Sequence, residues 1–306
     1  KTMRNAIAHW GSGHCEDNRG VKIAAVQMVS TPDVARNLEA AARLVGEAAA
    51  GGAQLVALPE YFCLLGRRDG DKLAAAERAG SGPIQQALAE LARRHRVWLV
   101  GGTLPIAANA LHSMGAAHAA DGTDRVGNAP AQRVLNRSCV YAPDGHEAAH
   151  YDKLHLFAFD NGRESYDEGR TLAAGTRPVA LDCDGWRVGL SICYDLRFPE
   201  LYRTLMQPPC DLVVVPSAFT HTTGQAHWGL LLRARAVENQ CYVLAPAQGG
   251  RHENGRRTWG HSMIVDPWGV VLACRAEGEG VVLADASRER IDEIRRQLPA
   301  LAHRRL

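Results

Sequence analysis

The apolar segments in the first hundred residues alternate between strand-like and helix-like patterns. Residues 22–28 form an apolar run of strand length. In the segment that follows, apolar side chains recur every three or four residues, as on the buried face of a helix: Val34, Leu38, Ala41, Val45 and Ala48. Thr31 and Pro32 predict where this helix begins, and Gly51-Gly52 predicts where it ends.

The alternation continues beyond this helix. Residues 54–60 and 97–102 are further apolar segments of strand length, and a helix that begins near Ser81 lies between them. The apolar side chains of this second helix again share one face. Such a β-α-β-α-β order is typical of helices that cover a largely buried sheet.

The second half of the chain repeats this plan after a predicted hairpin. The hairpin turns at residues 142–145, Ala-Pro-Asp-Gly, where Pro and Gly favour the dihedral angles of a turn. The later segments are a strand at 186–195, a helix through 198–206, a strand at 211–219, a helix at 226–240, a strand at 241–248, a hairpin that turns at 267–269 and a helix at 287–298. The likeness of LVALPE to LVVVPSA suggests two related halves. We therefore predict one α/β domain at residues 21–306, with two sheets between helix layers, after an N-terminal extension or cloning remnant at residues 1–20.

Composition excludes several classes of protein. The chain has 306 residues, of which 46% are hydrophobic and 22% charged, as in globular proteins with a sizeable core. Its 35 Lys and Arg nearly balance its 33 Asp and Glu, and neither sign forms a long block, which excludes a strongly basic nucleic-acid binder. No apolar run reaches the roughly 18 residues of a membrane-spanning helix.

The cysteines point to free thiols. None of the eight cysteines belongs to a Cys-x-x-Cys pair, and Cys139 and Cys241 lie inside apolar segments. The first twenty residues also lack the continuous apolar core of a signal peptide. We therefore expect a reducing cytoplasm, in which one thiol is free to act as a nucleophile.

Three residues of different chemistry follow predicted strands. Glu60 ends a buried strand, Lys153 follows a hairpin strand, and Cys193 lies where an apolar strand gives way to polar residues. Side chains at the ends of such strands converge on a crevice. There a thiol can attack an amide carbon, a carboxylate can take the thiol proton, and an ammonium can stabilise the developing oxyanion.

Taken singly, each of these residues also has an ordinary structural interpretation. Cysteines in apolar runs are usually small core residues, Glu60 is also suited to cap a turn, and Lys153 to lie on a solvated face. Spacing along the chain does not connect the three. The residues alone therefore leave two hypotheses open, a cysteine hydrolase and three unrelated structural residues.

Six segments in register resemble the nitrilase superfamily of carbon–nitrogen hydrolases. They cover the chain from about residue 22 to its end, in the order expected of the superfamily. The segments are LVALPEYF, YDKLHLF, GRESYDEG, GLSICYDLRFPELYR, HWGLLLRARAVENQCYVLAPAQ and GHSMIVDPWG. The resemblance implies a four-layer α-β-β-α sandwich and a Glu-Lys-Cys triad at Glu60, Lys153 and Cys193.

The resemblance also implies the roles of individual residues. Glu60 takes the proton of Cys193 and later activates water, while Lys153 and the backbone N–H of Tyr194 receive the oxyanion. A second glutamate near the thiol matches Glu164, which orients the triad, positions substrate and water, or merely holds its loop. No metal or cofactor is implied, and the 13 histidines show no metal-ligand spacing.

The residues after the nucleophile indicate which kind of carbon–nitrogen hydrolase the chain resembles. True nitrilases have Cys-Trp-Glu here, whereas this chain has Cys193-Tyr194-Asp195, which favours an amidase. The motifs most resemble the branch that contains the deaminated glutathione amidases, with the omega-amidases close by. Substrates of both groups carry an anionic 2-oxo acid end, so a cationic pocket residue is expected. Arg197 is the candidate, although we favour its packing at a subunit interface, because a pocket arginine lacks a partner before substrate binds.

Two alternatives remain beside this prediction. One is an N-carbamoyl amino-acid hydrolase, and the other is a binding scaffold of the same fold without turnover. The presence of all three triad residue types favours an active enzyme on a small-molecule amide, with neither nucleic acid nor membrane as a partner. The resemblance further implies a homodimer or higher homo-oligomer, with residues 198–206 and 299–306 at the contact.

Overall fold

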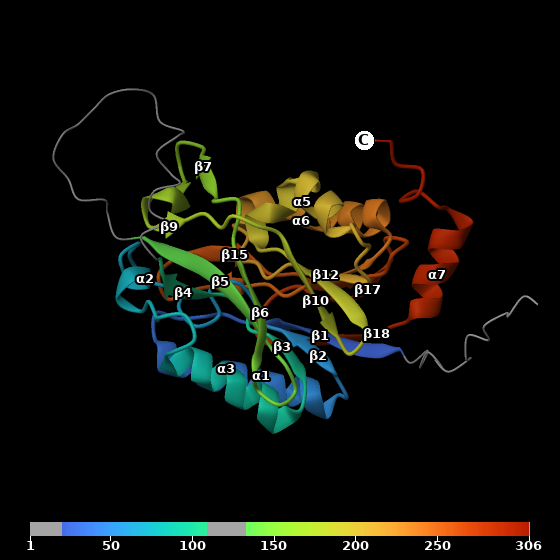
Figure 1. Ribbon diagram of the computed structural model, residues 1–306. Coiled ribbons are helices and arrows are strands. Elements are labelled where there is room, and N and C mark those ends of the chain that lie inside the picture. Colours follow the sequence, from blue (N-terminus) through green and yellow to red (C-terminus); the bar gives the residue numbers. More distant parts are fainter. Residues whose placement is uncertain (1–19, 109–132, 306) are drawn as a thin grey trace, which may run out of the picture.

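Two large sheets pack face to face between two layers of helices. The computed structural model describes residues 20–108 and 133–305, so residues 1–19 of the predicted extension lie outside the described residues. Figure 1 shows α1 and α3 covering one sheet and α5 and α6 covering the other. The predicted four-layer α-β-β-α sandwich is confirmed.

The first sheet is built around three parallel strands. These central strands are β1 (Val21–Gln27), β2 (Leu55–Ala57) and β3 (Trp98–Val100). The order across the sheet is β18-β1-β2-β3-β5-β4, in which β18 (Gly280–Ala286), β5 (Val134–Tyr141) and β4 (Leu104–Ala107) are the other members. β6 (Glu147–Asp152) and β9 (Leu172–Ala173) also pair with β5, and β5 with β6 forms the predicted hairpin.

The second sheet has a similar parallel centre. Its order is β10-β11-β12-β13-β16-β17, and β11, β12 and β13 run parallel. The strands are β10 (Val179–Cys183), β11 (Trp186–Leu190), β12 (Leu212–Val214), β13 (Tyr242–Ala245), β16 (Ser262–Val265) and β17 (Val271–Arg275). The like sequences LVALPE and LVVVPSA thus occupy β2 and β12, the central strand of each parallel set.

The helices and short hairpins complete the fold. The helices are α1 (Val34–Ala50), α2 (Asp71–Ala74), α3 (Pro83–His95), α5 (Pro199–Leu205), α6 (His221–Asn239) and α7 (Arg288–Gln297). Two 3₁₀ helices, η1 (Glu168–Arg170) and η2 (Cys193–Arg197), lie near the carboxyl ends of strands. The hairpins are β7 (Ala158–Asp160) with β8 (Ser165–Asp167), and β14 (Gly249–Arg251) with β15 (Arg257–Trp259). No helix among residues 20–108 and 133–305 is long and apolar enough to cross a membrane.

Alternating side chains of β1 explain why the first sheet is buried on both faces. Ile23 and Ala25 belong to the core between the sheets. Ala24 and Val26 belong to the core beneath α1 and α3. Because successive side chains of a strand point to opposite faces, a strand buried on both sides is apolar throughout.

Some predicted boundaries differ from the structure. α1 begins at Val34 rather than Pro32, because the Asp33 carboxylate accepts a hydrogen bond from the backbone N–H of Arg36 and caps the helix. α6 begins at His221, five residues earlier than predicted, and the Thr220 side chain caps it. The strand predicted at 186–195 ends at Leu190, where the chain turns into the candidate site.

Candidate active site

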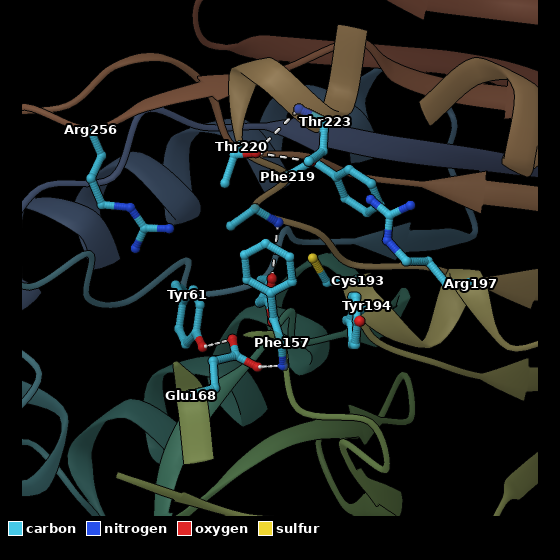
Figure 2. A pocket seen from close by; sticks show the side chains of 12 residues that line it. Tyr61, Phe157, Glu168, Cys193, Tyr194, Arg197, Phe219, Thr220, Thr223 and Arg256 are labelled. Carbon is cyan, nitrogen blue, oxygen red and sulfur yellow. Dashed lines mark hydrogen bonds between the residues drawn. The ribbon is translucent and has the colours of Figure 1, made fainter. Parts of the chain in front are cut away.

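Two turns after parallel strands bring a carboxylate and a thiol into one pocket. Glu60 follows β2, and the next residue, Tyr61, has φ of 55°. Cys193 follows β11 and has φ of 47° itself. Positive φ is uncommon outside glycine and is concentrated at functional sites. Both turns contribute side chains to the lining of one pocket, which Figure 2 shows from close by.

The space of the pocket, counted together with open solvent at its opening, is about 330 Å³. Cys193 is only 8% exposed, and its sulfur points into this space (Figure 2). The pocket is lined by Glu60, Tyr61, Phe157, Glu168, Cys193, Tyr194, Arg197, Ala218, Phe219, Thr220, Thr223 and Arg256. Its walls therefore combine four aromatic residues with four charged ones.

Lys153 lies behind this lining and is bound to two carboxylates. Its side chain comes from the segment after β6 and is fully buried. The ammonium Nζ donates to Glu60 Oε1 at 2.8 Å and to Glu168 Oε2 at 2.8 Å. A buried ammonium is stable only with such partners.

Glu60 is held on both of its oxygens. Oε1 also accepts a hydrogen bond from Asn136 Nδ2 on β5 at 2.9 Å, and Oε2 accepts one from the Ala218 N–H at 3.0 Å. Ala218 belongs to the segment after β12 in the other sheet. The carboxylate thus bridges the two sheets beside the thiol.

The second glutamate of the cluster is Glu168. The prediction that Glu164 occupies this place is wrong, because Lys153 contacts Glu168 instead. Glu168 Oε1 accepts from Tyr61 Oη at 2.7 Å, and Oε2 accepts from the Phe157 N–H at 2.8 Å. Glu164 lies in the turn between β7 and β8, where Oε2 accepts a hydrogen bond from exposed Thr222 Oγ1 at 3.0 Å. The hairpin carries Glu164 in its turn, and the chain returns to Lys153 four residues later, at Glu168.

Sequence reasoning missed Glu168 although the signal was present. The motif GRESYDEG at residues 162–169 contains two glutamates, and either satisfies the residue type. The loop geometry that separates them depends on hairpin pairing between β7 and β8. Asn136 was missed as well, because nothing local to a buried strand marks an amide that faces Glu60.

The protonation of the cluster follows from its burial and charges. Burial lowers the pKa of Lys153, but the carboxylates of Glu168 and Glu60 outweigh it and hold the pKa well above the ordinary value. Burial raises the pKa of Glu168, yet the Lys153 ammonium and hydrogen bonds lower it overall. Burial and the Glu60 carboxylate raise the pKa of the Cys193 thiol well above its usual range. The resting site therefore holds a neutral thiol near the Lys153 ammonium and the Glu168 carboxylate.

Asp195 ties the nucleophile turn to the segment that carries Lys153. The buried carboxylate accepts hydrogen bonds from Tyr151 Oη at 2.7 Å, from His155 Nδ1 at 2.7 Å and from the His155 N–H at 3.0 Å. It also accepts one from the N–H of Ile192 at 2.9 Å, directly before Cys193. His155 thus serves as a hydrogen-bonding partner in the structure. Asp195 is a positioning group that the sequence analysis did not assign.

Tyr194 and Arg197 lie in the 3₁₀ helix η2. The first N–H groups of a helix lack acceptors within it, and the N–H groups of Cys193 and Asp195 on either side of Tyr194 donate to Pro216 O and Ile192 O. This leaves the Tyr194 N–H at the nucleophile available for a substrate oxygen. The Arg197 side chain lines the pocket.

Arg197 is held by aromatic rings rather than by an acid. Its guanidinium lies 5.7 Å from the ring centre of Tyr194 and 5.4 Å from that of Phe219, and Nη1 is 3.2 Å from His227 Nδ1. Within residues 20–108 and 133–305, no carboxylate forms an ion pair with it. Across the same residues, no group of three or more His, Cys, Asp or Glu is arranged to hold a metal ion.

Comparison with known proteins identifies the family. The carbon–nitrogen hydrolase family profile matches residues 22–296, and this chain belongs to that family. It is therefore a carbon–nitrogen hydrolase acting on amides, as the resemblance predicted. A deaminated glutathione amidase of Synechocystis sp. is 40% identical over 284 residues, covering 92% of this chain and 97% of that protein.

Solved structures agree with this assignment. Saccharomyces cerevisiae Nit3, a member of branch 10 of the nitrilase superfamily, superimposes with a TM-score of 0.77 at 30% identity, over 92% of this chain and 94% of Nit3. The Caenorhabditis elegans NitFhit protein superimposes with a TM-score of 0.79 at 37% identity. The match covers 94% of this chain but 65% of NitFhit.

Proposed function

We propose that this chain is an amidase of the deaminated glutathione amidase type, in which Cys193 forms a thioester with the acyl half of a 2-oxo acid amide. One observation carries the proposal: Lys153 Nζ lies 2.8 Å from Glu60 Oε1, and Glu60 lines the same pocket as Cys193. A carboxylate, a thiol and an ammonium at one place are the groups that acyl transfer requires. The name of the Synechocystis relative supports the substrate class.

The proposed reaction has two halves that use the same carboxylate. Glu60 accepts the proton of Cys193 as the sulfur attacks the amide carbon, and the carbonyl oxygen becomes an oxyanion near the Tyr194 N–H and Lys153. The C–N bond then breaks, and the departing amine takes the proton from Glu60. A water molecule next gives a proton to Glu60 and attacks the thioester carbon. The C–S bond breaks, and the thiolate recovers the proton.

The raised pKa of Cys193 supports a mechanism in which a base removes the thiol proton during attack, rather than one that starts from a preformed thiolate. A buried thiol with a carboxylate beside it stays protonated at neutral pH, so proton transfer must accompany attack. Lys153, fixed between Glu60 and Glu168, keeps positive charge where the oxyanion forms without being free to release its own proton. We further propose that Glu168 orients Lys153 in this way.

Arg197 supports an anionic acyl group. The side chain lines the pocket, and the described residues place no acid on it. An anionic 2-oxo acid end would supply the counter-charge by binding the guanidinium. We therefore propose Arg197 as a substrate-binding residue, in place of the packing role favoured from the sequence.

A panel of substrates tests this proposal. Purified full-length protein is offered a 2-oxoglutaramyl-cysteinylglycine amide, 2-oxoglutaramate, ureido acids and nitriles, and released amine, ammonia and carbon dioxide are measured. We expect amine release from the peptide-like amide, a loss of at least about a thousandfold in Cys193→Ala, and unchanged turnover in Cys274→Ala, since Cys274 is an exposed cysteine of β17.

The other outcomes of the panel each identify an alternative. Preferred release of ammonia from 2-oxoglutaramate indicates an omega-amidase, and carbon dioxide together with ammonia indicates an N-carbamoyl amino-acid hydrolase. No turnover of any compound by the wild-type protein indicates a binding scaffold. Retained hydrolysis by Cys193→Ala contradicts the nucleophile assignment itself.

We also propose that the protein forms a homodimer in the cytoplasm. The C-terminal segment contacts α5, because Arg304 Nη1 donates to Arg203 O at 3.2 Å. The two segments predicted at the subunit contact are thus in contact with each other. The free thiols among the described cysteines support a reducing compartment. Sedimentation that finds only monomer at micromolar concentration contradicts the dimer.

A further inference from the structure

A second chamber opens beside the thiol pocket. Its space, counted together with open solvent at its mouth, is about 630 Å³, roughly twice that of the thiol pocket measured in the same way. Tyr61 and Arg256 line both spaces, so the chamber continues outward from the site. Figure 2 shows Arg256 and Arg197 on opposite sides of Cys193, which places the thiol between two cations.

Two half-buried cations form the wall of this chamber. Lys72 comes from the short helix α2, and its Nζ lies 4.9 Å from the ring centre of Tyr61. Arg256 comes from the turn between β14 and β15, and its guanidinium lies 5.1 Å from the ring centre of Tyr166. Both side chains are therefore positioned by aromatic rings.

Neither cation has an acid bound to it in the described part of the chain. Asp69 is the acidic residue at the chamber rim, where it is exposed and forms no ion pair with Lys72 or Arg256 among the described contacts. Glu168 is near, but its oxygens already accept from Lys153, Tyr61 and Phe157. The chamber lining also includes the exposed Arg67 and Arg68, so its cations outnumber its one acidic residue, Asp69, and its net charge is positive.

Cations placed this way favour the binding of an anion. Burial lowers the pKa of Lys72 although the Glu168 and Asp69 carboxylates act in the opposite direction. A carboxylate that enters the chamber would also oppose the effect of burial, and the planar guanidinium of Arg256 suits a carboxylate in a bidentate geometry.

We propose that Lys72 and Arg256 form a subsite for a carboxylate on the amine side of the scissile amide. The inference rests on the proposed amidase function and deepens it. The acyl half must stay beside Cys193 in the smaller pocket while it is a thioester, whereas the amine half leaves first. The larger and more outward chamber is the place from which a departing amine can escape.

This subsite defines a substrate class. Amides whose leaving amine is an amino acid or short peptide with a free carboxylate gain a contact with Lys72 and Arg256. Primary amides, which release ammonia, have no group to reach them. The chamber therefore favours a peptide-like leaving group over ammonia.

The experiment measures binding without turnover. The Cys193→Ala protein is titrated calorimetrically with 2-oxoglutaramyl-cysteinylglycine and with the same compound bearing a C-terminal carboxamide. We expect the free acid to bind about tenfold more tightly, as for one charge-assisted contact. The ratio of the two affinities should fall toward one when Lys72→Met or Arg256→Met is added. Because each ratio compares two ligands on one protein, a general loss of affinity cancels.

A matched control separates local binding from overall charge. Arg94 is an exposed arginine of α3, in the helix layer beneath the first sheet, so Arg94→Met removes the same charge and should keep the tenfold ratio. Equal affinity for both ligands in Cys193→Ala, or a ratio that neither Lys72→Met nor Arg256→Met reduces, overturns the subsite. Circular dichroism confirms that each variant is folded.

Failure of the subsite is distinguishable from failure of the amidase proposal. Turnover by the wild-type protein tests the amidase, and the affinity ratio tests the chamber. Hydrolysis of both compounds with an affinity ratio of one overturns the subsite alone. A retained tenfold ratio without any hydrolysis supports the subsite and contradicts the amidase.

Discussion

The ammonium of Lys153 and the carboxylate of Glu168 form a buried ion pair, with Nζ and Oε2 2.8 Å apart. Glu60 shares the same ammonium at an equal distance. One cation therefore pairs with two carboxylates in a space from which water is nearly excluded. Removal of any member changes the charge state of the others, because each is stable as an ion only with its partner.

The first prediction separates Glu168 from Glu164. Glu168→Gln keeps the shape of the side chain but removes one of the two carboxylates that pair with Lys153. We therefore expect kcat to fall about a hundredfold, as for loss of a positioned charged group. Glu164→Gln, whose partner is exposed Thr222, should change kcat less than about twofold. Steady-state kinetics on the preferred amide measure both. Equal losses in the two variants would contradict the assignment.

The second prediction concerns stability. Lys153→Met leaves Glu60 and Glu168 buried without their cation, and we expect the free energy of unfolding to fall by about 3–5 kcal/mol at neutral pH. Urea unfolding followed by circular dichroism measures it. Lys22→Met serves as a control, because Lys22 pairs with Asp285 in an exposed position and should cost less than about 1 kcal/mol.

The stability that Lys153 contributes should fall at both low and high pH. The pKa of Glu168 is lowered in the folded state, so its contribution is present above the unfolded value of about 4.3 and is lost as pH falls through the folded value. The pKa of Lys153 is raised, so its contribution is present below the unfolded value of about 10.4 and is lost as pH rises through the folded value. The difference between wild type and Lys153→Met should be largest between about pH 5 and pH 10. A difference that is constant from pH 3 to neutrality would argue against the ion pair.

The third prediction tests Asp195. Asp195→Asn places an amide donor against the Tyr151 hydroxyl and the N–H groups of His155 and Ile192, so buried donors lose their acceptor. We expect a loss of about 2–4 kcal/mol in unfolding free energy, and a fall in kcat larger than the change in KM, because Cys193 shifts. Asp285→Asn, in an exposed position, should lie within about 0.5 kcal/mol of wild type. A stable, fully active Asp195→Asn protein would refute the positioning role.

The fourth prediction follows from the protonated thiol. Because the pKa of Cys193 is raised well above its usual range, alkylation of this residue by iodoacetamide should keep accelerating through pH 9 without a plateau near neutrality. Glu60→Gln removes a nearby negative charge that raises this pKa, so the acceleration should begin at lower pH. Mass spectrometry of the Cys193 peptide measures the rate. A plateau at neutral pH in the wild-type protein would mean that a thiolate is preformed.

The strand order of the fold explains why part of the site was predictable. Glu60 follows β2 and Cys193 follows β11, each a member of the parallel set of its sheet, and the carboxyl ends of such strands meet at one edge. Hydrophobic runs mark those strands in the sequence. Residues that follow such runs are therefore candidates on the strength of the amino-acid pattern.

Other parts of the site depend on pairing that the sequence does not display. Glu168 reaches Lys153 because β7 and β8 form a hairpin that carries Glu164 in its turn. Asn136 and Asp195 have buried positions whose partners come from distant segments. Local pattern contains no information on which of two nearby carboxylates faces a given ammonium.

By itself the sequence determined the alternation of strands and helices, the family, and the identities of the thiol, acid and amine, because periodicity and residue type are properties of the chain. The tertiary structure decided that Glu168 rather than Glu164 binds Lys153, that Arg197 faces the pocket, and that Lys72 and Arg256 share a chamber with Tyr61. These are relationships between side chains on separate elements. Their distances follow from how sheets, hairpins and turns pack in three dimensions, where a shift of four residues exchanges a buried ion pair for a surface contact.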